Sequence, residues 1–311
     1  MTVVVTGASG FVGRHICAAL VKVGLPVRGL VRQIPIRKNQ VDGVEYVRGV
    51  DIADAVTFTP EMFKDADAVI HLVGIIQENK KKGQTFQRIH VEGTRTVVDE
   101  AKRNGFDGRF VYMSAIGASQ SAPAEYSRTK YQAERIVTGS GLPHTIFRPS
   151  LVLGADGEFV AQMKDLVLHG GLPSGPFPVI PVPGPGFNLF QPIWADDLAQ
   201  CVVKSLTTGA TINQLYEVGG ATQLSFNELL KGFARGLGVP KKRLLHAPIP
   251  LLFAAATVME KFTSTPLVTR DQLKNLERDN ITTSQAVKEV FGVDPLTFDQ
   301  MITKIYAHGK S

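Results

Sequence analysis

Tyr126 and Lys130 are the pair of side chains whose types and spacing best suit a chemical reaction in this sequence. The pattern from Tyr126 to Val137 predicts a helix, on which positions four apart share a face. An ammonium group beside a phenol stabilises the phenolate and lowers the pKa of the phenol from its free value of about 10. Tyr126 could then exchange a proton with a substrate hydroxyl or carbonyl near neutral pH. Because the same spacing also occurs on ordinary helix surfaces, the surrounding elements decide what the pair means.

A glycine-rich turn near the amino terminus supplies the strongest of these elements. The β-branched run Val3 to Thr6 leads directly into the turn, and an apolar helical pattern follows it. Gly7 permits a tight turn, Gly10 lets the backbone approach a pyrophosphate, and Gly13 lets helix and strand pack closely. The phosphates would lie against the N–H groups at the positive end of the helix. The residues expected to contact a dinucleotide here are Gly7, Ser9, Gly10, Phe11, Val12, Gly13 and Arg14.

The end of the second predicted strand, Pro26 to Arg32, bears on which dinucleotide is bound. In proteins that bind NAD, an Asp or Glu near this point holds the ribose 2′-hydroxyl. No carboxylate occurs between Thr2 and Gln40, and Arg32 ends the strand while Arg14 follows the glycine turn. An arginine binds a 2′-phosphate through two charge-assisted hydrogen bonds, whereas a carboxylate would repel it. We therefore expect NADP(H) in preference to NAD(H).

Further cofactor contacts are expected where the next two strands end. The third predicted strand, Val44 to Val47, is followed by an aspartate that could accept a hydrogen bond from the adenine amino group or cap the next segment. The fourth, Ala68 to Gly74, ends in glycine, and its carboxyl end would lie beside the glycine turn. The expected contacts at these two strand ends are Asp51, Ile52, Leu72, Val73 and Gly74.

Strands alternate with helices at least five times before Pro149. The fifth predicted strand runs from Gly108 to Ser114 and the sixth from His144 to Phe147, with the helix of Tyr126 and Lys130 between them. This alternation predicts an α/β fold with a Rossmann-type, doubly wound parallel sheet and right-handed crossovers.

The domain organisation follows from a change in the sequence pattern after residue 149. Residues 1–149 would form the dinucleotide-binding domain, with a strand and a helix added from about 187–218. Residues 170–186 are rich in proline and glycine, which is typical of loops. Residues 150–186 and 219–311 would together form a smaller, mostly helical C-terminal part that binds substrate.

Composition excludes several other classes of protein. Of the 311 residues, 44% are hydrophobic and 20% are charged, as in ordinary globular domains. The formal charge is +6, but its basic residues are scattered apart from Lys80–Lys82 and Lys241–Arg243, so we expect no nucleic acid partner. Cys17 and Cys201 lack metal-ligand spacing, so we expect no metal. Because the first strand begins at residue 2, we expect a cytoplasmic protein.

Taken together, these motifs resemble the extended short-chain dehydrogenase/reductase superfamily, also called the NAD-dependent epimerase/dehydratase superfamily. The residues that carry the resemblance are Thr6–Gly13, Asp51-Ile52, Tyr126 with Lys130, Arg148-Pro149-Ser150 and Trp194–Asp197. It is closest to an atypical branch, that of the NADPH-binding accessory subunit of respiratory complex I and its bacterial relatives. The segments that point to this branch are Val31-Arg32, Phe190–Ile193, Tyr216–Gly220 and especially Thr269–Asn280. The resemblance implies that Lys130 also binds the nicotinamide ribose and that Pro149 contacts the cofactor.

The sequence departs from the superfamily pattern at the catalytic serine or threonine. The best register places Ala115 at that position, one residue after Ser114. Ser114, Ser119 or Ser121 could substitute for it. Loss of this hydrogen-bond donor reduces the stabilisation of the transition state by about 2.7–4 kcal/mol in comparable sites. In the accessory-subunit branch the dinucleotide is held rather than turned over, so Tyr126 and Lys130 do not by themselves establish turnover.

Three functions therefore remain open. The first is an NADP(H)-holding protein with a structural, regulatory or slow redox role. The second is an active NADP-dependent oxidoreductase in which Tyr126 donates a proton, Lys130 tunes its pKa and Ser114 polarises the substrate. Because Phe177–Val182 is apolar, its substrate would be a small apolar carbonyl compound, a quinone or an isoprenoid. The third is a nucleotide-sugar epimerase or dehydratase, since the fold alone does not separate these functions.

The apolar stretch from Pro250 to Phe262 bears on partners. It could belong to the core of the substrate-binding part. It could also form a patch, beside Lys241–Arg243, that attaches the protein peripherally to a membrane complex or to the inner face of a membrane.

Overall fold

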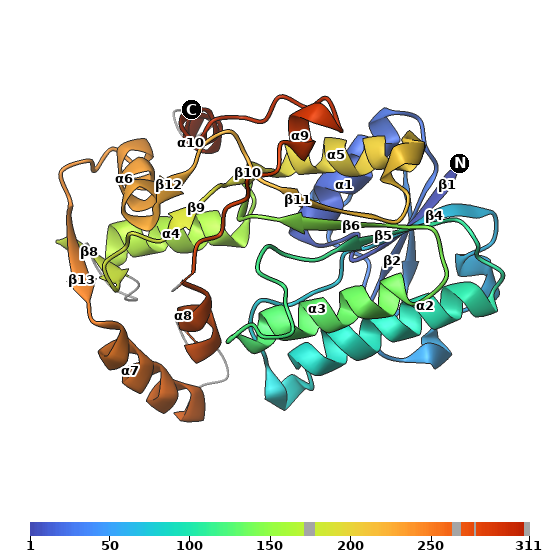
Figure 1. The fold of residues 1–311 in the computed structure, drawn as a ribbon, viewed down its shortest axis with the longest axis horizontal. Coiled ribbons are helices and arrows are strands. Elements are labelled where there is room, and N and C mark those ends of the chain that lie inside the picture. The colour runs from blue at the N-terminus through green and yellow to red at the C-terminus, as the bar shows by residue number, and fades with distance from the viewer. Residues whose placement is uncertain (171–177, 263–268, 277, 308–311) are drawn as a thin grey trace. The chain divides into compact units, whose positions relative to one another are not determined.

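The computed structural model of the protein describes residues 1–170, 178–262, 269–276 and 278–307 (Figure 1). The chain divides into two compact units, each assembled from separate stretches of the sequence. The first unit holds residues 1–149, 195–218 and 284–293. The second holds residues 150–194, 219–283 and 294–311.

Two segments lie in the opposite unit from the one expected. Residues 187–194 join the second unit because their short strands pair with strands of that unit. Residues 284–293 join the first unit, where the ring of Phe291 lies 5.4 Å from that of Phe147 and 5.1 Å from that of Tyr216. A local pattern indicates a strand or a helix, but long-range packing decides which sheet or core it joins.

A seven-stranded sheet forms the centre of the first unit, in the order β11-β6-β5-β4-β1-β2-β3. Its strands are β1 Thr2–Thr6, β2 Val27–Val31, β3 Val44–Arg48, β4 Ala66–His71, β5 Arg109–Met113, β6 His144–Pro149 and β11 Gln214–Val218. Every pairing is parallel, and β1 is fully buried from Val3 to Thr6. Branched side chains suit such a strand because both of its faces are covered. The expected doubly wound α/β fold is confirmed.

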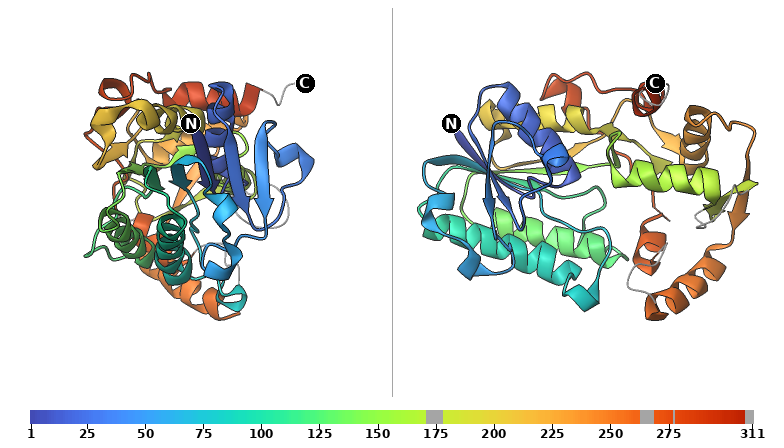
Figure 2. Two further views of the ribbon diagram at one scale, coloured as in Figure 1. Left: turned by 90° about the vertical axis from the view of Figure 1, so that its right-hand side faces the viewer. Right: turned by 180° about the vertical axis from the view of Figure 1, so that it is seen from behind.

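Helices cover both faces of this sheet (Figure 1, Figure 2). On one face lie α1 Phe11–Lys22 and α5 Ala195–Thr207, and on the other lie α2 Gly93–Arg103 and α3 Glu125–Thr138. The short helix α9 spans Ala286–Glu289, and single 3-10 turns span Arg37–Asn39, Ala55–Thr57, Pro60–Met62, Lys80–Lys82 and Gly209–Thr211. α5 begins at Ala195, and Asp196 in its first turn pairs with His15.

The apolar spacing of Ile89, Val97 and Ala101 predicts one helix from Thr85 to Asn104, but this segment consists of two pieces. Gln87–Glu92 winds as a π-helix, and α2 continues from Gly93. A Cβ at Gly93 would lie 2.5 Å from Cδ1 of Ile52, so the glycine leaves room for the end of that buried side chain. A π-turn shifts the side chains before it relative to those after it. The apolar spacing runs smoothly through both pieces, which is why the sequence indicates one helix.

The second unit combines short strand pairs with helices. Its strand pairs are β7 Val152–Leu153 with β10 Ile193–Trp194, β9 Leu189–Phe190 with β12 Leu224–Ser225, and β8 Val179–Pro183 with β13 Arg243–Ala247. Its helices are α4 Glu158–His169, α6 Phe226–Gly236, α7 Ile249–Phe262, α8 Arg270–Leu276 and α10 Phe298–Tyr306.

The proline-rich stretch after residue 170 contains β8, although we expected a loop throughout. A ribbon of two strands leaves an edge on which proline removes no ladder hydrogen bond. Ile180 and Val182 are buried in the core of the second unit, beside Leu229 and Phe233 of α6. Phe177, which we expected in an apolar substrate pocket, lies outside the described residues.

Asn280 joins distant parts of the second unit. Its Oδ1 atom accepts hydrogen bonds from Ser150 Oγ at 2.7 Å and from the backbone nitrogen of Leu151 at 2.9 Å. Its backbone nitrogen donates to the carbonyl of Leu189 at 2.7 Å, and its carbonyl accepts from the nitrogen of Gln191 at 3.1 Å. The last residue of the Thr269–Asn280 segment therefore holds three separate chain segments together.

Candidate functional site

Three glycines shape the turn between β1 and α1, each in a different environment. Gly7 has a φ of +75°, and a Cβ there would lie 3.2 Å from the backbone nitrogen of Val73. A Cβ at Gly13 would lie 2.1 Å from the carbonyl oxygen of Gly7, so the helix could not pack this closely with any side chain at that position. Gly10 is exposed, and a Cβ there would meet only the Gly7 oxygen, at 3.2 Å. Gly7 and Gly13 are needed for the turn itself, whereas Gly10 leaves an open backbone surface.

The amino-terminal end of α1 suits an anion. The helix begins at Phe11, no side chain caps it, and its first turn contains no acidic residue. The first N–H groups of a helix have no partners within it, and they carry the positive end of the helix dipole. Nη1 of Arg14 donates to the carbonyl oxygen of Ser9 at 3.1 Å, which holds the guanidinium across the turn. These residues fit the diphosphate of a dinucleotide.

Arg32 lies at the same edge of the sheet. β2 pairs with β1 so that Leu30 lies beside Thr6, and Arg32 follows two residues later. The carbonyl of Arg32 accepts a hydrogen bond from the nitrogen of Gly49 at 3.2 Å, which fixes its backbone. Its side chain is exposed. An exposed guanidinium at the end of β2 suits an additional phosphate on the adenosine ribose.

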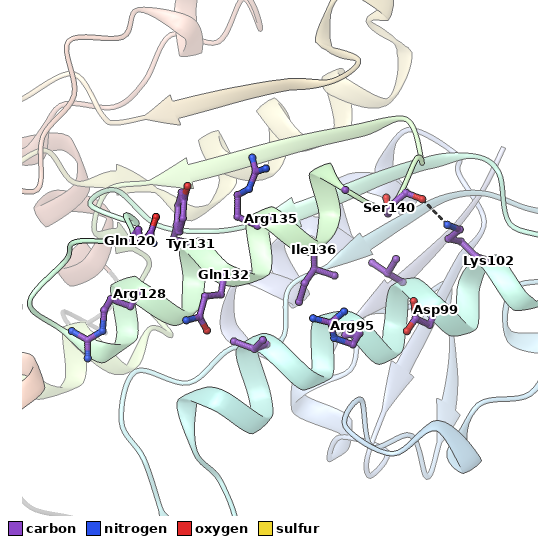
Figure 3. A pocket seen from close by; sticks show the side chains of 13 residues that line it. Arg95, Asp99, Lys102, Gln120, Arg128, Tyr131, Gln132, Arg135, Ile136 and Ser140 are labelled. Atoms are coloured by element: carbon purple, nitrogen blue, oxygen red, sulfur yellow. Dashed lines mark hydrogen bonds between the residues drawn. The ribbon is translucent and has the colours of Figure 1, made fainter.

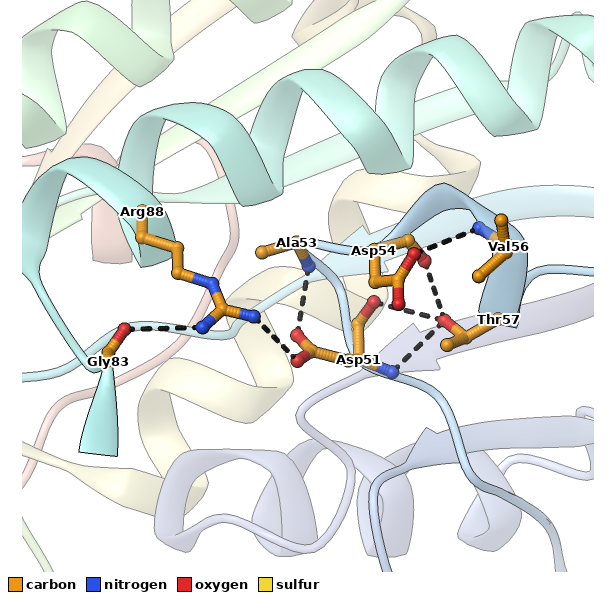
Figure 4. Close-up of polar contacts among 7 residues, drawn as sticks. All are labelled: Asp51, Ala53, Asp54, Val56, Thr57, Gly83 and Arg88. Carbon is orange, nitrogen blue, oxygen red and sulfur yellow. Dashed lines mark hydrogen bonds and ion pairs between the residues drawn. The ribbon is translucent and has the colours of Figure 1, made fainter.

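Asp51 is engaged by neighbouring groups of the chain (Figure 4). One carboxylate oxygen accepts from the backbone nitrogen of Ala53 at 3.0 Å, and the other from Nη2 of Arg88 at 3.1 Å. Its own nitrogen donates to Thr57 Oγ1 at 3.1 Å. Of the two uses considered for Asp51, the structure shows the capping of the following turn. Arg88, which the sequence did not single out, brings a second guanidinium to this edge, with 41% of its side chain exposed.

The other residues expected along this edge divide between core and surface. Ile52 is 6% exposed and packs in the hydrophobic core, so its side chain is out of reach of a ligand. The nitrogen of Leu72 donates to the carbonyl of Thr6 at 3.3 Å, and Val73 adjoins Gly7. The end of β4 therefore lies beside the glycine turn.

Pro149 ends β6 and is buried. Its carbonyl oxygen accepts a hydrogen bond from the nitrogen of Ile116 at 3.1 Å. This bond joins the loop after β5 to the end of β6, at the same carboxyl edge of the sheet.

Tyr126 lies in the first turn of α3, against two rings from the π-helical region. Its ring centroid is 5.5 Å from that of His90 and 5.8 Å from that of Phe86, both in edge-to-face geometry. Burial raises the pKa of Tyr126 to about 12. The expectation that Lys130 lowers this pKa is wrong, because the loss of hydration disfavours the phenolate more than the ammonium favours it.

Lys130 directs its ammonium group into the first unit. The residue is 4% exposed, and its Nζ donates to the carbonyl oxygen of Met113 at 2.9 Å. Nζ also lies 5.3 Å from the centre of the Tyr112 ring. A Cβ at Gly74 would lie 3.0 Å from Nζ, so glycine makes room for the lysine at the end of β4. Burial lowers the pKa of Lys130 to about 8, and the negative charge of Glu134 opposes this shift.

Ser114 is bound to a buried ion pair. Its Oγ donates to Oε1 of Glu134 at 2.5 Å, and the residue is 3% exposed. The Glu134 carboxylate also accepts hydrogen bonds from Nε and Nη2 of Arg148, at 2.8 and 2.7 Å. Because the hydroxyl donates its hydrogen bond to this carboxylate, its hydrogen does not point to a substrate in this structure. Ala115 has no hydroxyl, and in the loop before α3 Ser119 is half-buried and Ser121 exposed.

The sequence analysis missed His90 and Glu134. His90 is buried; its Nδ1 lies 2.9 Å from Thr129 Oγ1, and its Nε2 lies 3.1 Å from the backbone nitrogen of Ile75. Glu134 is 3% exposed and lies one helical turn after Lys130. A charged residue on the buried face of an amphipathic helix indicates a partner, and this signal was present in the sequence.

Two further observations bear on the kind of site. The described residues contain no cluster of three His, Cys, Asp or Glu side chains that could hold a metal ion. Within the same residues, no helix combines the length and apolar character that a bilayer-crossing segment needs.

Residues 3–219 match the model of the NAD dependent epimerase/dehydratase family. The chain belongs to this family. The matched range begins in β1, includes Tyr126 and Lys130, and ends just after β11. The family fold binds NAD(P), which agrees with the glycine turn and the open helix end. The resemblance to extended short-chain dehydrogenases is confirmed.

Family relatives include both respiratory-chain subunits and reductases. The chain is 26% identical to "NADH dehydrogenase [ubiquinone] 1 alpha subcomplex subunit 9, mitochondrial" of Arabidopsis thaliana, over 91% of this chain and 71% of that protein. It is 27% identical to "Ceramide reductase" of Caulobacter vibrioides, over 84% of this chain and 78% of that protein. The subunit 9 protein of Dictyostelium discoideum is 24% identical, over 91% of this chain and 77% of that protein.

Solved structures of epimerases share the fold. UDP-glucose 4-epimerase from Thermotoga maritima superposes with a TM-score of 0.73 at 17% identity, covering 99% of this chain and 98% of that one. The enzyme of the same name from Thermus thermophilus, in complex with NAD, gives 0.72 at 21% identity, with the same coverage. At this level of identity the likeness shows the fold alone.

Proposed function

We propose that this protein holds NADP(H) in its first unit as a structural or regulatory cofactor, with slow redox turnover or none. The observation that carries the proposal is the contact between Ser114 and Glu134. The turn that would bind the dinucleotide is intact, whereas the hydroxyl nearest the expected polarising position is bound to a buried carboxylate. The relatives named as NADH dehydrogenase subunits, which align over 91% of this chain, support the same role.

The choice of NADP(H) over NAD(H) rests on the charges at one edge of the sheet. Arg32 is exposed after β2, and Arg14 crosses the glycine turn. Arg88 adds a third guanidinium beside Asp51, whose carboxylate it partly neutralises. Three cations with one engaged carboxylate favour a cofactor that carries an additional phosphate.

A peripheral association with a membrane complex belongs to the same proposal. In the second unit, Leu251 of α7 is 65% exposed and Leu245 of β13 is 55% exposed. Lys241 and Arg243 are exposed a few residues before them. Apolar side chains flanked by cations suit contact with a membrane or with a protein embedded in it.

An NADP-dependent reductase is the second candidate, and the placement of Tyr126 and Lys130 favours it. In this role Tyr126 would donate a proton to a carbonyl oxygen, and Lys130 would stabilise the phenolate that remains. A phenol whose pKa is raised to about 12 keeps its proton at neutral pH, as a donor must. Two relatives are named "Ceramide reductase" and "2-alkyl-3-oxoalkanoate reductase", which supports an apolar carbonyl substrate. No feature of the described site favours a nucleotide sugar.

Purification without added nucleotide separates the two candidates. The holding role predicts one NADPH per chain, detected by absorbance and mass spectrometry after release from the protein. It also predicts that Tyr126→Phe keeps its cofactor and leaves the phenotype of the cell unchanged. An empty site in the wild-type protein would contradict the holding role, and loss of phenotype in Tyr126→Phe would favour the reductase.

A further inference from the structure

Three consecutive lysines lie on a closed turn that the cofactor site does not include. Asn79 and Gln84 exchange two backbone hydrogen bonds, at 2.8 and 3.0 Å. Between them Lys80–Lys82 forms a single 3-10 turn, in which Oδ1 of Asn79 accepts from the backbone nitrogen of Lys82 at 3.2 Å. Gly83 completes the turn with a φ of +66°, which L side chains rarely adopt. Hydrogen bonds within the turn therefore hold the three lysines in one place.

Two of these lysines carry uncompensated charges. Nζ of Lys80 lies 3.5 Å from Oε2 of Glu78, whose other carboxylate oxygen accepts a hydrogen bond from the nitrogen of Phe86 at 2.9 Å. Lys81 and Lys82 are exposed, and neither forms an ion pair with any residue that the structure describes. Their ammonium groups therefore produce a positive potential in the solvent around the turn.

The turn lies at the edge of the sheet that carries the proposed cofactor site. Nη1 of Arg88 lies 3.5 Å from the carbonyl oxygen of Gly83, and Nη2 of the same guanidinium lies 3.1 Å from the carboxylate of Asp51 (Figure 4). Asp51 follows β3, which is parallel to β2 and β1. Because parallel strands end at the same edge, the lysines share this edge with the glycine turn and with Arg32.

A positive potential at this edge acts on a dinucleotide before contact. Charges of one sign around a site raise the association rate of an oppositely charged ligand by about 10–10³ at low ionic strength. NADPH carries one phosphate more than NADH, so the same potential attracts it more strongly. Charges beside a site change the association rate and its dependence on salt, whereas groups in direct contact with the ligand change the dissociation rate.

We propose, on the basis of the NADP(H) site proposed above, that Lys81 and Lys82 steer the dinucleotide to its site and favour NADP(H) through the rate of association. The preference for the phosphorylated cofactor then has two sources. Lys81 and Lys82 act during the approach and do not contact the bound cofactor. Arg32 acts after contact, by holding the 2′-phosphate and slowing dissociation.

The test measures association and dissociation rates by stopped-flow fluorescence of NADPH and NADH, with the full chain freed of bound nucleotide by gel filtration in concentrated salt. Lys81→Glu/Lys82→Glu should slow the association of NADPH about tenfold at an ionic strength of about 0.01 M, where the screening length is about 30 Å. It should slow the association of NADH by a smaller factor. Dissociation rates should not change, and the difference from the wild type should disappear at an ionic strength of about 1 M.

Lys22→Glu/Lys64→Glu is the matched control, because it makes the same change in net charge at the opposite edge of the sheet. Lys22 ends α1, Lys64 precedes β4, and both are exposed. Lys102 is less suitable, since its Nζ donates to the carbonyl oxygen of Ser140 at 2.6 Å (Figure 3). The control should associate with NADPH at nearly the rate of the wild type.

Equal slowing of association in the two double variants would overturn the proposal, because net charge alone would then explain the rates. So would faster dissociation from Lys81→Glu/Lys82→Glu with unchanged association, since the lysines would then contact the bound cofactor. Slowing of NADPH and NADH by the same factor would also overturn it, because the lysines would then not favour NADP(H).

A wild type that binds neither dinucleotide would overturn the proposed cofactor, and the steering with it. Binding of NADPH at equal rates by the wild type and Lys81→Glu/Lys82→Glu would overturn the steering alone. Thermal unfolding checks that each variant is folded, and Lys81→Gln/Lys82→Gln with Lys22→Gln/Lys64→Gln replaces the two charge reversals if one of them is not.

Discussion

Arg148 of β6 and Glu134 of α3 form a bidentate ion pair. Nε and Nη2 of the arginine lie 2.8 and 2.7 Å from the two carboxylate oxygens. The side chain of Glu134 is 4% exposed and that of Arg148 is 18% exposed. Because Glu134 lies one helical turn after Lys130 and two after Tyr126, the pair fixes this face of α3 against the sheet. Four predictions follow from this and neighbouring contacts.

Arg148→Ala should strongly destabilise the fold. The substitution leaves the Glu134 carboxylate buried without its cation, which costs about 3–5 kcal/mol in the free energy of unfolding. Urea denaturation measures the loss. Arg235→Ala serves as the control, because Arg235 is 56% exposed and its partner Asp299 is 83% exposed, and such pairs contribute about 1 kcal/mol or less. Equal losses in the two variants would show that the buried pair does not hold the helix.

Gly13→Ala and Gly10→Ala should differ in their effects on thermal stability, although both should weaken NADPH binding. A Cβ at Gly13 would overlap the Gly7 carbonyl oxygen at 2.1 Å, so Gly13→Ala should lower both the melting temperature and NADPH binding. A Cβ at Gly10 has only one close neighbour, so Gly10→Ala should keep its melting temperature and lose affinity for NADPH. Gly209→Ala, with nothing within 4 Å of its Cβ, is the matched control. Unchanged NADPH binding in Gly10→Ala would place the diphosphate elsewhere.

Arg32→Ala should weaken NADPH binding about tenfold or more, because a charge-assisted hydrogen bond to phosphate contributes about 1.5–3 kcal/mol. Affinity for NADH should change little, since that cofactor lacks the 2′-phosphate. Titration by intrinsic cofactor fluorescence gives both constants. Arg103→Ala, at the end of α2, controls for the loss of one positive charge. Equal losses for the two cofactors would remove Arg32 from the 2′-phosphate site.

Lys130 should make the stability of the cofactor-free protein depend on pH above about 8. Burial lowers its pKa in the folded state from the ordinary 10.5 to about 8. Between these values the unfolded chain binds the proton and the folded chain does not, so the contribution of Lys130 to stability rises with pH. Below pH 8 both states are protonated and this dependence disappears.

Lys130→Met isolates this contribution. The free energy of unfolding of the wild type minus that of Lys130→Met should rise from pH 8 to pH 10, because only the wild type contains this lysine. Tyr126 is present in both proteins, so its own titration cancels in this difference. A difference that stays constant from pH 8 to pH 10 would mean that burial does not lower the pKa of Lys130.

The glycine turn, the parallel sheet and the site edge could be predicted because local chemistry decides them. Gly7, Gly10 and Gly13 have spacing that few other structures require, and strands ending in Arg32 and Gly74 must meet at one edge of a parallel sheet. The segment Thr269–Asn280, on which the resemblance to the accessory-subunit branch depends, also has a structural role, since Asn280 joins its own segment to residues 150–151 and 189–191.

What could not be predicted depends on partners far away in the sequence. The spacing of Tyr126 and Lys130 indicates a shared helix face but not the burial that raises one pKa to about 12 and lowers the other to about 8. Ser114 resembled a catalytic substitute until Glu134, twenty positions later, was found to accept its hydrogen bond. Val179–Pro183 resembled a loop because its strand partner lies more than sixty residues downstream.

The interleaving of the two units has a consequence for synthesis on the ribosome. The first unit needs β11 and the segment that carries Phe291, and the second needs Asn280 before Ser150 and Gln191 find their hydrogen bonds. The nascent chain must therefore carry β6 as an exposed edge of the unfinished sheet until β11 has been synthesised. A chain released before that point would leave the unpaired backbone groups of β6 open to pairing with strands of other proteins.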